Sequence, residues 1–128
     1  MILADCYLAC ITGATSELGS AIAYLLAKEG IPLMLTGRDQ EKLAKLKTSL
    51  PDAKVIAADL STDEGRKVVT GWIERWKPNL IINNAGAGLY GPAADREIEE
   101  QMAVIELNVL AATEITLASV QMLRREGR

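Results

Sequence analysis

The feature that most constrains the fold of this chain is an alternation of short apolar runs with longer segments of helical pattern. The apolar runs span residues 6–11, 33–35, 55–58 and 80–82, and each is followed by a turn and then by apolar residues at helical spacing. A strand that is apolar throughout is buried on both faces, as in a parallel sheet covered by helices on both sides. The pattern therefore predicts an α/β fold: a doubly wound parallel sheet of about four strands joined by right-handed crossovers.

The segments between the apolar runs predict the covering helices. Helices are expected at residues 17–28, 38–50 and about 95–124, and a further helix is expected to be capped by Ser61 or Thr62 and ended by Pro78. The side chains expected on the core-facing sides of the first and third helices are Leu18, Ile22, Leu25 and Leu26, and Val68, Val69, Trp72, Ile73 and Trp76, respectively. No domain boundary interrupts the pattern, so residues 1–128 are interpreted as one domain.

Net charge and hydropathy indicate which kinds of partner this chain can bind. The net charge of −3 disfavours nucleic acid and anionic membranes as partners, because phosphate binding needs a concentrated basic face. No uninterrupted run of 18 apolar residues occurs, so no membrane span is expected, and residues 1–5 lack the basic start of a signal peptide. A small molecule or another protein is the expected partner, and a cytoplasmic location is expected.

The residue types that are absent also exclude some chemistry. The chain has no histidine, which removes the Ser-His-Asp triad and the HExxH zinc site. Its two cysteines, Cys6 and Cys10, are four residues apart, which suits neither a CxxC redox pair nor a zinc cage. Buried free thiols are the favoured interpretation, and no metal site is expected.

The loop after the first predicted strand has the most chemical content. It contains Thr12-Gly13 and, six residues after Gly13, Gly19. A glycine there lets the backbone approach a pyrophosphate closely, and the free N–H groups at the start of the following helix favour an anion. No lysine follows in the pattern of a phosphate loop, and the second glycine of a plain GxGxxG fingerprint is missing. The alternative is that Gly13 only relieves a tight turn.

Several short motifs, taken in order, resemble the classical branch of the short-chain dehydrogenase/reductase family. They are Thr12-Gly13 with Gly19, Gly37-Arg38, Asp59-Leu60, Asn83-Asn84-Ala85-Gly86, and Asn108. The resemblance covers nearly the whole chain and implies a Rossmann-type sheet with strand order 3-2-1-4. Such a sheet binds its ligand at the carboxyl ends of the strands, where these loops lie.

The resemblance implies a role for each loop in binding a dinucleotide. The residues that it assigns to the pyrophosphate and adenine ribose are Gly13, Ala14, Thr15, Ser16, Leu18 and Gly19. Asp59 would accept from the adenine amino group beside Leu60, and Asn84, Ala85 and Gly86 would line the ribose. Asp59 has a helix-capping carboxylate as its alternative role, and Asn84 can also brace the fourth strand.

The end of the second strand predicts NADP(H) as the cofactor. Relatives that prefer NAD usually have an acid there, where this chain has Gly37 followed by Arg38. A guanidinium offers several donors to a 2′-phosphate, which a carboxylate would repel. The alternative, that Arg38 is merely solvated at a helix start, is disfavoured because a cation there opposes the helix dipole.

The sequence departs from the family pattern in two places. Glu17 replaces the middle glycine of the first loop, so a carboxylate is expected to lower cofactor affinity unless it points into solvent. The chain also stops at Arg128, near the end of the long fourth helix, and the family's catalytic serine and Tyr-x-x-x-Lys follow that point. Tyr24 and Lys28 have the spacing of that pair but are interpreted as a chance match on the core-packing side of a helix.

These departures shape the functional expectation. The complete protein is expected to be an oxidoreductase that transfers hydride between NADP(H) and a small-molecule carbonyl or alcohol, with this chain as its cofactor-binding fragment. Of the catalytic set only Asn108 is present, which in the family helps to position a water; its alternative is a satisfied polar residue in a buried helix. The isolated chain is expected to be inactive, and the alternative function is a non-catalytic nucleotide-binding or regulatory module.

Self-association, as a homo-oligomer or otherwise, is expected from the surfaces that such a half-fold leaves open. Strand 80–82 would be an open edge, and the long helix carries a mostly apolar stripe. The stripe consists of Ile98, Met102, Ile105, Val109, Ala112, Thr116 and Ser119. The alternative is a monomer whose long helix folds back over the edge.

Overall fold

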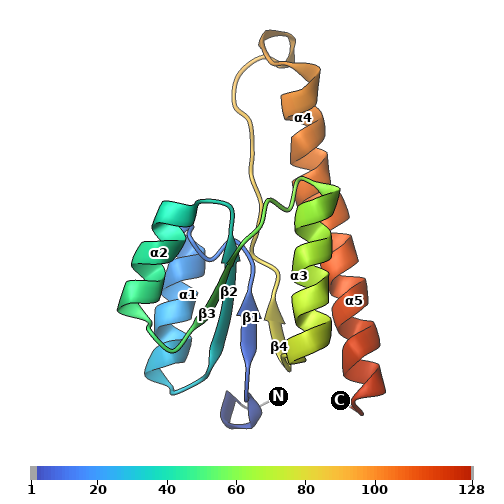
Figure 1. Cartoon of the computed structure of the whole chain (residues 1–128). Coiled ribbons are helices and arrows are strands. Elements are labelled where there is room, and N and C mark those ends of the chain that lie inside the picture. The colour runs from blue at the N-terminus through green and yellow to red at the C-terminus, as the bar shows by residue number, and fades with distance from the viewer. Residues whose placement is uncertain (1–2, 128) are drawn as a thin grey trace.

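The sheet has the predicted architecture. The computed structural model describes residues 3–127, so residues 1, 2 and 128 of the predicted domain lie outside it. Within this range a parallel sheet has the strand order β3-β2-β1-β4 (Figure 1). The strands are β1 (Ala9–Ile11), β2 (Leu33–Gly37), β3 (Lys54–Ala57) and β4 (Leu80–Ile82). The prediction of a doubly wound α/β fold with the order 3-2-1-4 is therefore confirmed.

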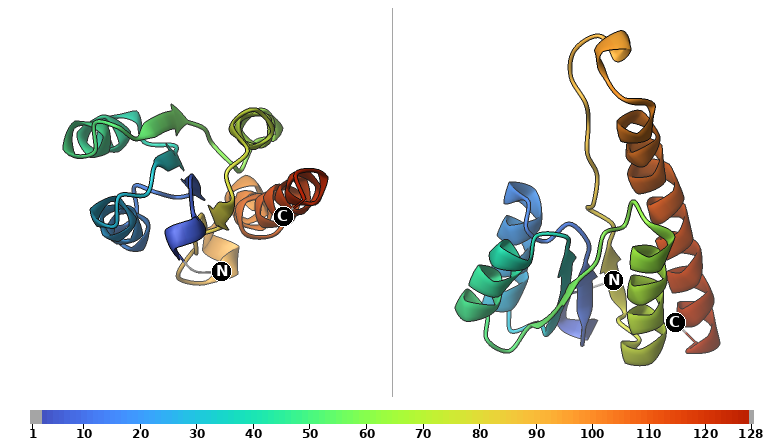
Figure 2. Two further views of the ribbon diagram at one scale, coloured as in Figure 1. Left: turned by 90° about the horizontal axis from the view of Figure 1, so that it is seen from below. Right: turned by 45° about the horizontal axis from the view of Figure 1, so that its top comes forward.

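Helices cover both faces of this sheet. In the view along the strands, α1 (Glu17–Lys28) and α2 (Gln40–Ser49) lie on one side, and α3 (Asp63–Trp76) and α5 (Ala112–Arg125) lie on the other (Figure 2). The remaining helical elements are α4 (Ile98–Ile105), the short 3-10 helices η1 (Leu3–Asp5) and η2 (Ala93–Asp95), and the π-helical turn η3 (Glu106–Ala111). The helices α4, η3 and α5 follow one another without a break.

Alternate residues of the strands supply two separate cores. Ile11 and Leu35 belong to the cluster beneath α1 and α2, and Cys10 and Met34 belong to the cluster beneath α3 and α5. All four side chains are fully buried, which explains why these strands are apolar without alternation. Ile11 is in register with Leu35 and with Ile82, so the loops that follow these strands emerge at the same edge of the sheet.

Side-chain caps explain where the helices begin. Ser16 accepts a hydrogen bond from the backbone N–H of Gly19, and α1 has the predicted bounds. Asp39 caps α2 in the same way, so that helix starts two residues later than residue 38, where it was expected. Of the two caps proposed for α3, Thr62 is the one that accepts from the helix, at Gly65 N.

The expected core-facing sides of α1 and α3 were wrong in part. On α1 the buried residues are Gly19, Ala23 and Leu26, whereas Leu18 and Leu25 are 64% and 65% exposed. The small residues bring α1 close to the sheet, and a rule that counts only large apolar side chains misses them. On α3, Val69 and Ile73 are buried as expected, but Val68 and Trp76 are exposed.

The long helix extends well beyond the sheet. The end of the run that includes α4 projects past the carboxyl ends of the strands, together with the loop after β4 (Figures 1 and 2). Its contact with α3 is made through Ala111, Ile115, Ser119 and Met122, which are buried. Most of the predicted stripe is exposed, including Ile98, Met102, Ile105 and Val109, and Ser119 is its buried member.

The same helix modifies the expectation about membrane spans. Although carboxylates interrupt it, the run Ile98–Arg125 has 28 residues and a window of mean hydropathy 1.5, so it could cross a membrane by length and composition alone. The core helix of a soluble protein passes the same test but is mostly buried, whereas 17% of this window is buried. Two of its carboxylates, Glu106 and Glu114, pair with Arg66 of α3, so the helix is integrated into the folded domain.

Candidate functional site

A cavity opens at the carboxyl ends of the strands, where the predicted site residues converge. It has a volume of about 290 Å³. It is lined by residues from the loops after β1, β2, β3 and β4, from the end of β2, from the start of α2 and from η3: Gly13, Thr15, Ser16, Thr36, Gly37, Arg38, Asp39, Lys42, Ala58, Asp59, Leu60, Ala85, Gly86, Ala87 and Leu107. Of the predicted site residues, Ala14, Leu18, Gly19, Asn84 and Asn108 do not line it.

Gly13 supports both roles considered for it. Its φ of +62° is a left-handed conformation that favours glycine in the turn. A Cβ at this position would also lie 2.8 Å from the Cα of Ala85, so the loop after β1 touches the loop after β4 through bare backbone. The glycine therefore serves the turn and the close approach of two walls of the cavity.

Asn84 braces these two loops. Its Nδ2 donates to the carbonyl of Gly13 at 3.0 Å and to Ser16 Oγ at 3.1 Å. The hydroxyl oxygen of Thr12 in turn accepts from the backbone N–H groups of Asn84 and Ala85, each at 3.0 Å. The structural role proposed for Asn84 is thus observed, and its side chain acts behind the cavity wall.

Thr62 is the residue that caps α3, so the helix-capping role considered as the alternative for Asp59 was wrong. The Oδ1 of Asp59 accepts from the hydroxyl and the backbone N–H of Ser61, at 2.6 and 3.0 Å. The hydrogen bond from the Ser61 side chain is the largest cause of a lowered Asp59 pKa, which partial burial opposes and the nearby Arg38 charge also lowers. The carboxylate is therefore ionised at neutral pH on the cavity wall, where it can accept from a ligand as well.

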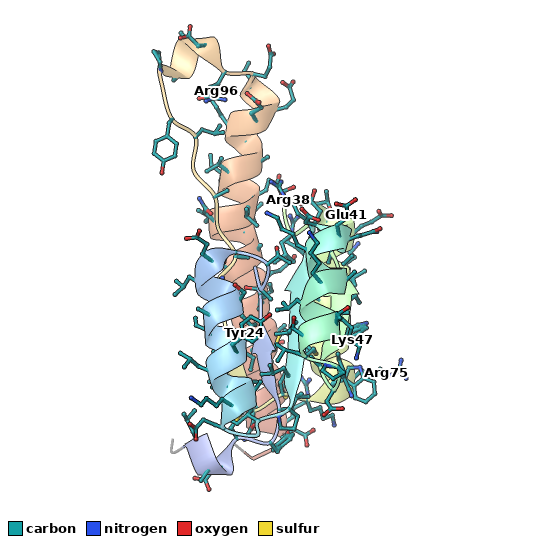
Figure 3. The ribbon with its side chains drawn as sticks, turned by 90° about the vertical axis from the view of Figure 1, so that its left-hand side faces the viewer. Tyr24, Arg38, Glu41, Lys47, Arg75 and Arg96 are labelled. Carbon is teal, nitrogen blue, oxygen red and sulfur yellow. The ribbon has the colours of Figure 1, made fainter. Side chains whose placement is uncertain are left out.

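Basic residues gather at the mouth of the cavity beside β2. Arg38 follows Gly37 directly, and Figure 3 shows it at the same end of the molecule as the start of α2. Lys42, four residues further on, also lines the cavity and was not among the predicted site residues. The helix expected at 38–50 would have placed Lys42 on the same side as Arg38. In the structure α2 begins at Gln40, and Arg38 precedes it.

Thr36 is a second residue of the cavity wall that was not predicted from the sequence. It is fully buried at the end of β2, and its hydroxyl is the one buried side-chain polar atom without a hydrogen-bond partner among residues 3–127. The residue also lines the cavity. Buried polar groups are normally paired, so an unpaired hydroxyl at a cavity indicates a place for a ligand or a water.

Asn108 is used to hold the loop after β4. Its Nδ2 donates to the carbonyl of Ala87 at 2.6 Å, and its Oδ1 accepts from the N–H of Ala87 at 2.9 Å. Both polar groups of the side chain have hydrogen-bond partners, as in its alternative role, but Asn108 itself is exposed and does not lie in a buried helix.

Asn83, which was not predicted as a site residue, joins the end of β4 to α5. Its Nδ2 donates to the carbonyl of Ala112 and to Thr116 Oγ1.

The residues that depart from the family pattern lie outside the cavity. Glu17 is exposed on the first turn of α1 and does not line the cavity. Tyr24 is 46% exposed (Figure 3), so the core-packing side that was expected for the Tyr24 and Lys28 pair was wrong. The reason is that Gly19, Ala23 and Leu26 form the inner side of α1. Neither Tyr24 nor Lys28 lines the cavity.

The cysteines are buried free thiols, as expected. Cys10 lies on β1 within the sheet, and its burial raises the pKa of the thiol to about 12. Burial also raises the pKa of Cys6. Neither thiol therefore provides a thiolate nucleophile at neutral pH.

Comparison with known proteins finds relatives of this chain. A family model described as short chain dehydrogenase matches residues 7–128. An uncharacterized oxidoreductase of Staphylococcus saprophyticus is 31% identical over 108 residues, which is 79% of this chain and 46% of that protein. The chain thus spans about half the length of the curated relatives it matches.

Solved structures show the same similarity in three dimensions. A short-chain dehydrogenase from Sphingobium yanoikuyae in complex with NADPH superposes with a TM-score of 0.87 at 28% identity, covering 94% of this chain and 49% of that one. The L-sorbose reductase from Gluconobacter frateurii, complexed with NADPH and L-sorbose, gives a TM-score of 0.80 at 30% identity, with the same coverage of 94% and 49%.

Proposed function

Because the chain belongs to the short-chain dehydrogenase family, a family of oxidoreductases, we propose that its cavity binds NADP(H) and that it supplies the cofactor-binding part of a carbonyl reductase or alcohol dehydrogenase. Two structural neighbours that carry NADPH support a nicotinamide cofactor. The L-sorbose reductase and a ketone-specific alcohol dehydrogenase from Comamonas testosteroni, with a TM-score of 0.84 at 27% identity, support a small-molecule carbonyl or alcohol as the substrate class.

The observation that carries the choice of NADP(H) is the pair of cations on the cavity wall beside Gly37. Arg38 and Lys42 both line the cavity there. A guanidinium gives a phosphate several donors in a fixed plane, and an ammonium adds a point charge. Asp39 lines the cavity as well, and its Oδ1 accepts from Lys42 N at the start of α2. The 2′-phosphate of NADP(H) therefore has two cationic partners and one carboxylate at this wall.

The other walls fit the remaining parts of a dinucleotide. A Cβ on Gly37 would lie 3.0 Å from Thr15 Cγ2, and one on Gly86 would lie 3.1 Å from Asn108 Oδ1, so these glycines let the segments that form the walls pack closely. The unpaired hydroxyl of Thr36 offers a further hydrogen bond. The start of α1, a helix of 12 residues, points its N–H groups toward the loop of Gly13, which suits a pyrophosphate.

Each segment of the chain then has a task in binding. Gly13, Thr15 and Ser16 hold the pyrophosphate, Asp59 accepts from the adenine amino group, and Ala85 and Gly86 contact the ribose. Leu60 supplies an apolar surface for the adenine, and Asn84 keeps the first and fourth loops together. When bound, the nicotinamide supplies or accepts the hydride, and residues of this chain orient it.

Asn108 acts in this proposal through the backbone. Its paired hydrogen bonds to Ala87 fix the segment after Gly86, which lines the cavity. Its role with a water in proton transfer remains a prediction. The alternative function, a nucleotide-binding module without catalysis, also remains a prediction, since the sole Tyr-x-x-x-Lys in this sequence, Tyr24 to Lys28, lies away from the cavity.

Calorimetric titration of the 128-residue chain tests the proposal. NADPH is expected to bind more tightly than NADH, and Arg38→Asp is expected to weaken NADPH binding by about ten- to a hundredfold, as for loss of a charged hydrogen bond of about 1.5–3 kcal/mol. Lys45→Asp is the matched control, because Lys45 is an exposed cation of α2 that does not line the cavity. Equal binding of NADPH and NADH by the unmodified chain would contradict the assignment.

A further inference from the structure

Arg66 is a buried cation at the junction of three segments that surround the cavity. It belongs to α3, and its side chain is 8% exposed. We propose that Arg66 is a positioning residue of the cofactor site, which ties the loop after β3 to both flanks of the π-helical turn η3 and so sets the shape of the cavity. The expected effect of Arg66 on cofactor binding rests on the proposed function. Its effect on the shape of the cavity does not depend on that function.

The guanidinium uses its donors on three different segments. Nη1 donates to the carbonyl of Leu60 at 3.2 Å and to Glu106 Oε2 at 2.9 Å. Nε donates to Glu114 Oε2 at 3.1 Å. Glu106 is the first residue of η3, and Glu114 lies in the first turn of α5, so the two carboxylates bracket the π-helical turn.

These contacts bear directly on the cavity. Leu60, whose carbonyl accepts from Arg66, lines the adenine side. Leu107, the residue after Glu106, lines the cavity from η3. Asn108 follows it and holds Ala87, another lining residue, by two hydrogen bonds. One side chain therefore connects lining residues that come from the loop after β3, from η3 and from the loop after β4.

The geometry of the three partners explains why an arginine suits position 66. A π-helical turn is rare and occurs mostly as a single turn at functional sites, so carboxylates fixed on both sides of it hold its position. A buried charge must be compensated by partners in good geometry. The planar fork of arginine reaches the carbonyl and both carboxylates together, which a lysine ammonium with a single point of charge cannot do.

Substitution of Arg66 with two readouts tests the inference. Arg66→Lys keeps the charge and loses the fork, and Arg66→Met removes both. In the ligand-free chain we expect both variants to shift the NMR resonances of the Ala87 amide and the Asn108 side-chain amide. In calorimetry we expect NADPH affinity to fall at least tenfold in each. Glu106→Gln keeps the packing and one hydrogen bond, so we expect smaller shifts of the same resonances and a smaller loss of NADPH affinity. This variant replaces Arg66→Met in the test if Arg66→Met does not fold.

Arg75→Met is the matched control. Arg75 is an exposed cation about two and a half turns further along α3, and its guanidinium lies 5.1 Å from the centre of the Trp76 ring. It should leave both the Ala87 resonance and the NADPH affinity unchanged. Wild-type resonances for Ala87 and Asn108 in folded Arg66→Lys would overturn the inference, and so would a loss of affinity no larger than the unfolded fraction explains. If the unmodified chain binds no NADPH, the proposed function fails, and the resonances still decide the role of Arg66.

Discussion

Replacing Gly19 with alanine is expected to damage both the fold and the cofactor site. A Cβ at Gly19 would lie 2.2 Å from the carbonyl oxygen of Gly13 and 2.7 Å from Asn84 Nδ2. Ordinary contacts of a carbon atom are about 3.5–4 Å long, so the loop carbonyl has to move by about an ångström or more. The loop that moves is the one assigned to the pyrophosphate, which links the steric conflict to binding.

The magnitude follows from two opposing contributions. Alanine is favoured over glycine inside a helix by about 0.5–1 kcal/mol. Forcing an extra carbon into a packed site costs about 1–3 kcal/mol and sometimes more, and a contact with backbone is at the upper end because the backbone cannot rotate away. Subtracting this helix preference from a steric cost of about 3 kcal/mol, we expect Gly19→Ala to lower the free energy of unfolding by about 2–2.5 kcal/mol.

Gly71→Ala is the matched control, and urea unfolding is the assay. Gly71 is an exposed helical glycine of α3, and a Cβ there would meet nothing within 4 Å. This variant should gain about 0.5–1 kcal/mol, so the two variants should differ by about 3 kcal/mol, which is the steric cost at Gly19. The fluorescence of Trp72 and Trp76 on α3 reports the transition. Equal stability of the two variants, or undiminished NADPH binding by Gly19→Ala, would refute the argument.

Four further expectations concern separate features. Glu17→Gly should tighten NADPH binding by up to about fivefold in calorimetry, since an exposed charge contributes at most about 1 kcal/mol; weaker binding would show that Glu17 assists the ligand. Cys10, whose pKa is raised to about 12, should resist alkylation at pH 8 until urea unfolds the chain, and rapid labelling in native buffer would contradict its burial. Because hydrogen bonds from Ser61 lower the Asp59 pKa in the folded chain, the stability that they provide should be present above the unfolded pKa of about 3.9 and lost as pH falls through the folded value. Asp59→Asn should therefore show a weaker loss of stability in acid, and an unchanged acid transition would count against this assignment. Light scattering should show self-association through the exposed side of α4, which Met102→Lys should reduce; a monomer at all concentrations would exclude it.

Much of the fold could be predicted because the strands are apolar throughout and the turns contain glycine, proline and capping residues. The bounds of α1 and β4 were predicted correctly, since Ser16 and Gly30 mark the first and Pro78 and Asn83 mark the second. The inner side of α1 was not, because close packing there uses Gly19 and Ala23. Hydrophobic spacing identifies large side chains, whereas the distance between a helix and a sheet depends on small ones.

The candidate site was predicted where backbone motifs define it and missed where side chains converge from distant segments. Gly13, Arg38 and Asp59 line one cavity because their strands are parallel and in register. Thr36 was missed because it follows the predicted strand 33–35 and belongs to none of the short motifs. Arg66 was missed because its partners, Glu106 and Glu114, are 40 and 48 residues away in the sequence, and no local pattern indicates such a pairing.

The central claim is that the cavity at the carboxyl ends of the strands holds NADP(H), and chemical-shift mapping of the chain during NADPH titration tests it most directly. The amides of Gly13, Ser16, Leu60 and Gly86 should shift together and saturate. A second cavity is lined in part by Gly30, Ile31, Ser49 and Leu50, and the amides of these residues should stay in place. The phosphorus resonance of the 2′-phosphate should also shift, and less so with Arg38→Asp. Shifts confined to the second cavity, or none at millimolar NADPH, would contradict the account.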